Sequence, residues 1–479
     1  MNQLSLDLCD IQGDVLEGLP KNYERFIFYK IVSSIFFKQY LKQHVIQRIT
    51  NAMQVHDWEM ALQSRRTRGY GSLDPLLGLN LGFTKDGVAQ LVGARPNLDP
   101  AFDKGAAHRD TIEKLHDSSP PNWLKNFISD RIDGILLVTA RDRSSVTSHS
   151  NHLLHSLGSS IKVVYSEIGA TRPGPERGHE HFGFLDGISQ PGIRGLTTVS
   201  DLRRRPDQGL PGQDLLWPGE FVFGYPAQHP DDPHKEGPAP EMAAPWMRNG
   251  SFMVFRRLEQ KVPEFRRFVR EQAARLGMDP ELLASRMVGR WKSGAPLERA
   301  PRRDDPRLGV DQKRNNDFEF GDDPEQRQCP YAAHIRKVYP RDDTRNEAEI
   351  QRHRVIRAGI PFGPEVAPGE TTTAHSRGLM FVCYQTSIER QFECIQRHAN
   401  DPNFVSGKRR PAGGAVMPGC DAIIGQAKGN GPREMDEPYP NYPAGNRRTT
   451  LEIPRQFVVL TAAGYFFMPS ISALHTELT

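Results

Sequence analysis

The stretch GHEHFGFLDGISQPGIRG, residues 178–195, gathers glycines, aromatic residues, two histidines and one aspartate in a segment without helical periodicity. Asp186 stands between Leu185 and Gly187, in a run apolar enough to predict a buried carboxyl group. Burial would raise the pKa of this carboxyl toward the range that suits a general base. The alternative is an aspartate whose side chain caps a turn. The stretch predicts an ordered loop with Asp186 as its candidate acid–base group.

Two histidines of the same stretch, His179 and His181, are separated by one residue. On a strand this spacing points both side chains to one face, where they would form half of a metal site. No third ligand follows at a metal-binding spacing. Hydrogen bonding within the loop is therefore the interpretation that we favour for this pair.

The segments outside this loop mix strands and helices without a regular alternation. Five apolar runs predict strands: residues 134–140, 160–170, 250–258, 378–386 and 456–469. Two amphipathic helices are predicted, at 262–278 and at 387–399, the second with Ser387 as its candidate N-cap. A Pro-rich stretch at 201–247 is the best candidate for a crossover between domains. The mixture favours an α+β fold over a doubly wound α/β fold.

Composition and charge exclude several classes of protein. Lys and Arg number 62 and Asp and Glu 58, and a net charge of +4 is too small for a nucleic-acid-binding footprint. The longest apolar stretch, Phe26 to Phe37, contains Lys30 and is shorter than the roughly twenty residues that cross a bilayer. The first residues lack a signal peptide, which predicts a cytoplasmic protein, or a secreted one if a leader was removed. We expect neither nucleic-acid nor membrane partners.

A second candidate for chemistry is CPYAAHIRKVYPR, residues 329–341. Pro330 can open a helix and Pro340 can end it, which would place His334 one turn in, beside small alanines. Small neighbours allow a flat macrocycle to approach, so His334 could be an axial ligand of haem iron. Arg336 follows and could pair with haem propionates. The alternative is a capping or core histidine with a solvated basic flank.

Two further strings contribute charged residues. In RHRVIRAGIPFGPEV, residues 352–366, Arg357 follows an apolar segment and precedes a Gly-Pro loop. Its side chain could bind an anion, or it could form a surface salt bridge. In MPGCDAIIGQAKG, residues 417–429, Asp421 precedes an apolar turn. Asp421 could accept the second ring N–H of a ligating histidine, or it could be an ordinary helix N-cap.

Together these strings resemble the dye-decolourising peroxidases. HFGFLDGISQPG resembles the G-x-x-D-G signature of that family, and AAHIRK followed by RAGIPFG resembles its proximal-histidine helix and distal-arginine loop. The resemblance extends in order over nearly the whole chain, and the length is closest to that of the longer members common in fungi. Further matching strings are IQGDVLEGLPK (11–21), PGEFVFGYP (218–226), NGSFMVFRRL (249–258), GRWKSGAPL (289–297), RGLMFVCYQTSIERQFECIQ (377–396) and GYFFMPSISAL (464–474).

The resemblance implies a fold and a cofactor. It implies two ferredoxin-like domains with antiparallel sheets, of the dimeric α+β barrel type. Residues 1–215 would carry the distal G-x-x-D-G loop, and residues 216–479 would form the haem-binding domain. One haem b per chain would lie toward the C-terminal half, in a monomer or a homodimer.

The resemblance also implies roles for residues. His334 would be the axial iron ligand, with Asp421 as the acid that accepts its other ring N–H. Asp186 would be the distal acid–base group and Arg357 the charge stabiliser. The cofactor-binding set would be completed by Leu379 and Phe381, which would line the distal pocket, and by Arg336 at a propionate.

The implied activity is a haem peroxidase, an oxidoreductase. It would reduce hydrogen peroxide to water through a ferryl intermediate and oxidise small aromatic reductants, either phenols or dyes. The alternative function is haem handling or iron release, as in a deferrochelatase-like protein, without fast peroxide turnover.

Overall fold

The computed structural model describes residues 6–68, 76–93, 99–117, 122–197, 209–344, 346–404, 418–425, 433–437 and 449–479. Residues 201–208 of the Pro-rich stretch therefore lie outside the described residues. Among the described residues, no helix is both long enough and apolar enough to cross a membrane.

Four strands from the N-terminal part of the chain form the first half of a large sheet. They are β1 (Tyr23–Ile31), β2 (Gly78–Phe83), β3 (Gly134–Ala140) and β4 (Ile161–Ala170). Their spatial order is β2-β3-β1-β4, and all neighbours are antiparallel. All seven residues of β3 are buried, as expected of a strand covered on both faces.

Four strands from the C-terminal part repeat this arrangement. They are β7 (Ser251–Gln260), β9 (Ile360–Phe362), β10 (Gly378–Gln385) and β13 (Val458–Met468), in the spatial order β13-β7-β10-β9. In both halves the first strand lies between the third and the fourth, and the second lies outside the third. This is the ferredoxin-like order, so the predicted fold class is confirmed.

The two halves join into one closed sheet. Gly169 of β4 pairs with Phe362 of β9, and Phe467 of β13 pairs with Phe83 of β2. Because β7 also pairs with β10, every one of these eight strands has a neighbour on each side. The sheet is therefore a barrel, and each joint between its halves rests on a single residue pair.

Aromatic side chains from both halves pack together in the core. The ring of Phe28 on β1 lies 4.9 Å from that of Phe255 on β7 and 6.1 Å from that of Phe466 on β13, measured between centroids. All three residues are fully buried. Edge-to-face and tilted contacts of this kind add to the stabilisation from apolar burial.

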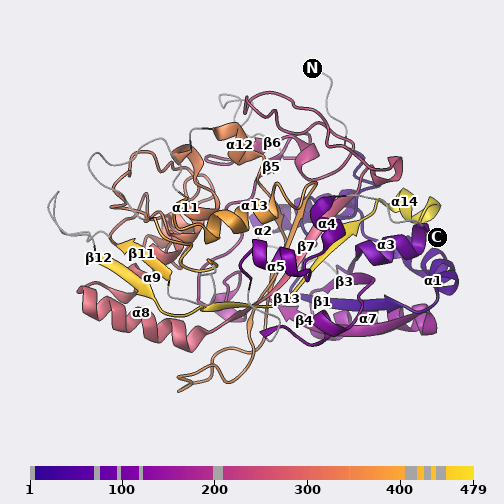
Figure 1. Ribbon diagram of the computed structural model, residues 1–479, viewed down its shortest axis with the longest axis horizontal. Helices are drawn as coiled ribbons and strands as arrows, with labels where there is room; N and C mark the ends of the chain where they lie inside the picture. The colour runs from indigo at the N-terminus through magenta and orange to yellow at the C-terminus, as the bar shows by residue number, and fades with distance from the viewer. Residues whose placement is uncertain are drawn as a thin grey trace.

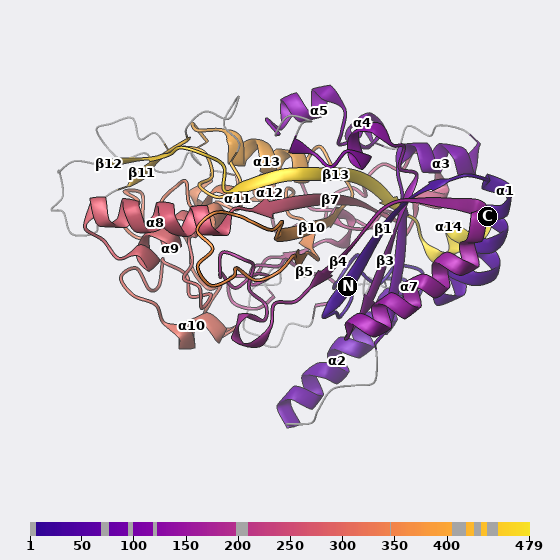
Figure 2. The ribbon, with the colours of Figure 1, turned by 90° about the horizontal axis from the view of Figure 1, so that it is seen from below.

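The helices gather at the two ends of the barrel. Figures 1 and 2 place α1 (Ser34–Tyr40), α3 (Lys85–Val92) and α7 (Arg143–Leu157) at one end, and α8 (Val262–Leu276), α9 (Pro280–Val288), α11 (His334–Val338) and α13 (Phe392–Asn400) at the other. Smaller or peripheral elements are α2 (Ala52–Arg68), α4 (Pro100–Lys104), α5 (Arg109–Lys114), α6 (Asn126–Ser129), α10 (Pro306–Val310), α12 (Glu347–Gln351), α14 (Ile471–Thr476), β5 (Gly192–Ile193), β6 (Leu215–Leu216), β8 (Ile356–Arg357), β11 (Arg433–Glu437) and β12 (Thr449–Ile453).

Most elements predicted from the sequence are present. The five predicted strands correspond to β3, β4, β7, β10 and β13, and the helix predicted at 262–278 is α8, which ends at Gly277 in the left-handed conformation. The second predicted helix begins at Phe392, not at Ser387. Gln391 ends the preceding turn because its side chain donates to the carbonyls of Glu220 and Arg354.

The predicted domain boundary between residues 215 and 216 falls inside β6, which pairs in parallel with β5. It remains a prediction.

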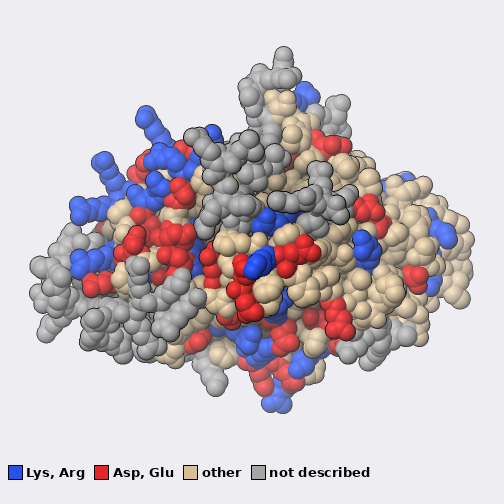
Figure 3. All heavy atoms as spheres, turned by 90° about the horizontal axis from the view of Figure 1, so that it is seen from above, with Lys and Arg blue, Asp and Glu red and all other residues tan. Residues whose placement is uncertain are grey.

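On the surface, acidic and basic side chains are interspersed over the face that Figure 3 shows.

Candidate active site

One cavity is lined by segments from both halves of the chain. The loop 180–189 forms one part of its wall, and side chains of β7, β8, β10, α11 and α13 form another, together with residues of several loops. The wall is largely apolar, with a small number of charged side chains among the apolar ones. Cavities of this composition are typical of cofactor and substrate sites.

His334 faces this cavity from the first residue of α11. The predicted helix start at Pro330 is wrong, because the backbone N–H groups of Cys329 and Tyr331 donate to the side chains of Asp323 and Gln326 and hold this segment as a turn. The side chain of His334 is 27 % exposed, and its Nε2 has no hydrogen-bond partner among the described residues.

Nδ1 of His334 lies 2.8 Å from Oδ2 of Asp421, a fully buried carboxylate. The other oxygen of Asp421, Oδ1, accepts from the backbone N–H groups of Ile423 and Ile424, each at 2.8 Å. Burial acts to raise the pKa of Asp421, but His334 and these two donors outweigh it and lower the pKa. Asp421 thus caps a turn, not a helix, with one oxygen and contacts His334 with the other.

Asp186 and Arg357 form an ion pair on the same cavity, with Nη1 of Arg357 3.3 Å from Oδ1 of Asp186. The expected burial of Asp186 is wrong, since its side chain is 43 % exposed. Gly183 and Gly187 have positive φ angles of 102° and 79°, and they turn the backbone so that Asp186 points into the cavity. The Gly187 N–H donates to Oδ1 of Asp186 at 2.6 Å, which leaves Oδ2 without a protein donor among the described residues.

The charges of Asp186 and Arg357 both act on the pKa of His334, so the three groups lie close together around the same cavity. Burial acts to lower the pKa of His334, and Asp421 outweighs it and raises the pKa. Leu379 and Phe381 line the same cavity from alternate positions of β10.

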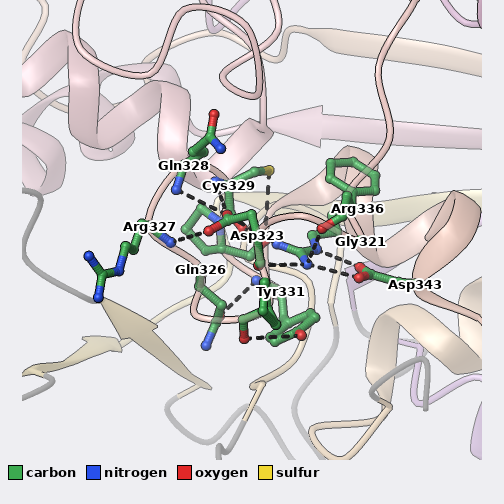
Figure 4. A network of polar contacts seen from close by, with 12 residues as sticks. Gly321, Asp323, Gln326, Arg327, Gln328, Cys329, Tyr331, Arg336 and Asp343 are labelled. Atoms are coloured by element: carbon green, nitrogen blue, oxygen red, sulfur yellow. Dashed lines mark hydrogen bonds and ion pairs between the residues drawn. The ribbon is translucent and has the colours of Figure 1, made fainter. Parts of the chain in front are cut away.

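Arg336 does not line the cavity. Its guanidinium is fully buried and pairs with Asp343 at 2.6 Å and Asp323 at 3.4 Å, and it also donates to the carbonyl of Cys329 at 2.5 Å. Figure 4 shows the side chain of Arg336, a residue of α11, between Asp323 and Asp343. This position gives no support to a propionate contact for Arg336.

Two other buried arginines, Arg290 and Arg341, do line the cavity. Their guanidinium groups donate to Asn316 and to backbone carbonyls, and neither has a carboxylate within ion-pair distance among the described residues. Burial lowers the pKa of both, that of Arg290 to about 9. Arg341 also has φ 52°, an unusual value for a residue other than glycine. No sequence pattern distinguished these two arginines from the many others in the chain.

The two histidines of the opening loop have separate environments. His181 is buried, and its Nε2 lies 2.8 Å from the carbonyl oxygen of Phe362. Nδ1 of His179 lies 3.3 Å from the carbonyl oxygen of its near neighbour Arg177. In the part of the chain that the structure describes, no cluster of three His, Cys, Asp or Glu side chains could hold a metal ion.

The residues of the cavity fit a haem. An imidazole nitrogen without a protein partner suits an axial iron position, and apolar walls suit the macrocycle. Arg290 and Arg341 supply buried positive charge without a carboxylate at ion-pair distance among the described residues, which suits the two carboxylates of a haem.

Comparison with known proteins gives a consistent set of relatives. Family models described as "DyP dimeric alpha+beta barrel domain" and "Dyp-type peroxidase, C-terminal" match residues 10–173 and 228–408. Dye-decolorizing peroxidase msp1 of Mycetinis scorodonius is 34% identical over 99% of this chain and 88% of that protein. An ancestral D-type dye decolorizing peroxidase superposes with a TM-score of 0.86, at 39% identity and 99% coverage of both chains. A dye-decolorizing peroxidase in complex with 2,6-dimethoxyphenol gives a TM-score of 0.80, at 35% identity and coverage of 99% of this chain and 100% of that chain.

Fold, cavity and relatives together define a haem peroxidase. The chain belongs to the dye-decolourising, or DyP-type, peroxidase family.

Proposed function

We propose that this peroxidase binds one haem b through His334 and reduces hydrogen peroxide to water with Asp186 and Arg357. The observation that carries the proposal is the convergence of a carboxylate-oriented histidine and an Asp–Arg pair on one cavity. When bound, the haem supplies the iron that takes up oxidising equivalents from peroxide and passes them to a reductant.

His334 presents Nε2 to the cavity because Nδ1 donates its proton to Asp421. A negatively charged acceptor makes the imidazole a stronger electron donor toward iron. Asp421 is fixed in turn by two backbone N–H groups, so the ring orientation is set before any cofactor binds.

Asp186 acts on peroxide through Oδ2, since its Oδ1 already accepts from Gly187 and Arg357. Oδ2 takes the proton from one oxygen of hydrogen peroxide and returns it to the other, which leaves as water. Arg357 keeps a fixed positive charge beside Asp186 and stabilises the negative charge that develops on the departing oxygen.

Arg341 and Arg290, and not Arg336, are the proposed partners of the haem carboxylates. They are the cavity-lining arginines whose donors reach only neutral acceptors among the described residues. A b-type haem is favoured because the chain contains no C-x-x-C-H string, the pattern that attaches a c-type haem.

Small phenols are the proposed reductants, with dyes as a further class. The solved relative in complex with 2,6-dimethoxyphenol supports this choice. The haem-handling alternative is not favoured, because relatives that match across the whole chain are peroxidases. Oligomeric state and cellular compartment remain predictions.

The test is to load the protein with haem and to follow the Soret band after adding one equivalent of hydrogen peroxide. The wild type should react rapidly. Asp186→Asn should retain the Soret band but react about 10²–10⁴-fold more slowly. Asp232→Asn is the matched control, because Asp232 pairs with Lys235 away from the cavity. A wild type that binds haem without reacting with peroxide would support haem handling instead.

A further inference from the structure

We propose that Gln190 is a positioning residue, which holds the backbone of Arg357 against the loop that carries Asp186. This inference rests on the proposed function, since it matters for catalysis only if Asp186 and Arg357 act on peroxide. Gln190 is half-buried and follows Asp186 by four residues.

The side-chain amide of Gln190 makes two reciprocal hydrogen bonds to one residue. Its Nε2 donates to the carbonyl oxygen of Arg357 at 2.5 Å, and its Oε1 accepts from the Arg357 N–H at 3.2 Å. A primary amide has one donor side and one acceptor side, so it can satisfy both backbone groups of a strand residue at once.

Arg357 needs such a partner because β8 lies at the end of the strand order. β8 has only two residues and pairs with β10 alone. The N–H of Ala358 donates to the carbonyl of Val382, and in this antiparallel register the N–H and C=O of Arg357 point away from β10. Gln190 therefore takes the place that a further strand would occupy.

The same loop also holds the guanidinium of Arg357. Nη2 donates to the carbonyl of Ser189 at 3.3 Å, and Nη1 pairs with Asp186. On its other side the loop is held by Gln213, whose Nε2 donates to the backbone carbonyl of Gln190 at 3.0 Å. Without Gln190, only the ion pair and the long bond to Ser189 would fix the distance between loop and strand, and partly exposed ion pairs do this poorly.

The chain contains a matched control for this arrangement. Gln12 makes the same reciprocal pair with Leu81 on β2, since its Nε2 donates to the Leu81 carbonyl and its Oε1 accepts from the Leu81 N–H, both at 2.9 Å. Gln12 is fully buried and does not line the cavity. Gln12→Ala therefore removes the same reciprocal pair, and in addition a bond from Nε2 to the Pro469 carbonyl at 2.8 Å, without touching the Asp186–Arg357 pair.

The first experiment measures the backbone without any cofactor. Hydrogen exchange of the Arg357 amide should be slow in the haem-free wild type and in Gln12→Ala, and faster in Gln190→Ala. With haem bound, Gln190→Ala should keep the haem stoichiometry and the KM for a phenolic reductant. Its rate constant with hydrogen peroxide should fall by about tenfold to a hundredfold, the size expected when a reacting group is misplaced by about 1 Å.

Gln190→Glu adds a second measurement, the pH dependence of the reaction with peroxide. A residue that only stabilised the fold would not change this pH dependence. The ionised carboxylate can accept from the Arg357 N–H but cannot donate to its carbonyl, whereas the protonated acid can do both. The ratio of variant to wild-type rate should therefore rise as the pH falls. The charged groups near this position are Arg357, Asp186 and, next to Gln213, Asp214, and wild type carries the same three.

The possible outcomes separate the two proposals. If wild type reacts with peroxide and Gln190→Ala reacts as fast as Gln12→Ala, the inference is overturned and the proposed function stands. A pH-independent ratio for Gln190→Glu would likewise overturn it. If haem-loaded wild type does not react with peroxide, the proposed function fails, and the role of Gln190 fails with it.

Discussion

Asp421 binds His334 with one carboxylate oxygen and caps the following turn with the other. The two residues are 87 positions apart in the chain, so the orientation of the histidine depends on the packing of the C-terminal part. One aspartate therefore couples the local fold of residues 421–425 to the reactivity of the cavity.

Replacing Asp421 by Asn separates the capping of the turn from the effect of the negative charge on His334. The amide oxygen can still accept from the Ile423 and Ile424 N–H groups, so the turn should persist. The negative charge beside Nδ1 is lost, and we expect a higher iron reduction potential and about tenfold to a hundredfold lower activity. Spectroelectrochemical titration checks this, and an unchanged potential would show that Asp421 does not tune the histidine.

Arg341→Met should weaken haem binding. It removes a buried positive charge that faces the cavity and has no protein carboxylate within ion-pair distance among the described residues. A charged hydrogen bond contributes about 1.5–3 kcal/mol, which corresponds to about tenfold to a hundredfold in affinity. Haem titration of the variant measures the change, with Arg299→Met as a control on an exposed ion pair with Asp317. Equal haem affinity in both variants would rule out Arg341 as a carboxylate partner.

Arg336→Met should instead lower the stability of the fold. The substitution leaves Asp323 and Asp343 buried without their cation, and breaking a buried pair in this way costs about 3–5 kcal/mol. Arg327→Met is the control, because the Arg327–Glu325 pair is exposed and such pairs contribute about 1 kcal/mol or less. Urea unfolding of the haem-free proteins compares the two. A similar loss in both variants would contradict the importance of the buried network.

The stability of the protein should fall with rising pH because of Glu298. Burial raises the pKa of Glu298 from 4.5 to about 9, and its Oε1 has no hydrogen-bond partner among the described residues. An acid whose pKa is raised on folding stabilises the protein below its unfolded pKa, and this contribution is lost as the pH rises toward the folded pKa. Glu298→Gln should therefore unfold at a higher temperature than wild type at pH 8, with a smaller difference at pH 5. Calorimetry at the two pH values tests this, and a difference independent of pH would count against it.

Much of the fold was predictable because strands have strong local patterns. The run GILLVTA corresponds to β3, and the apolar repeat of residues 262–278 to α8. The first residue of α13 could not be predicted from the sequence. The side chain of Gln391 donates to the carbonyls of Glu220 and Arg354, which are remote in sequence, and these contacts delay the start of the helix. Closure of the sheet also depends on pairings such as Gly169 with Phe362, for which no local signal exists.

The candidate site was partly predictable for a related reason. His334 and Asp421 each lie in a distinctive string, but the burial expected for Asp186 is wrong, because its side chain lines the open cavity and is 43 % exposed. Arg336 follows His334 by two residues, which on a helix is a rotation of about 200° and points it away from the cavity. Val338, four residues after His334, does line the cavity.

The closed barrel has a consequence for biosynthesis. β13 is the last of the eight barrel strands along the chain, yet it supplies the pairing with β2 and one neighbour of β7. During translation, β2 and β7 therefore emerge with open edges that other chains could add to, until β13 has left the ribosome. A chain that stalls before residue 458 would lack β13, the strand that closes the barrel. We expect chaperones to bind such a chain, and we do not expect it to bind haem.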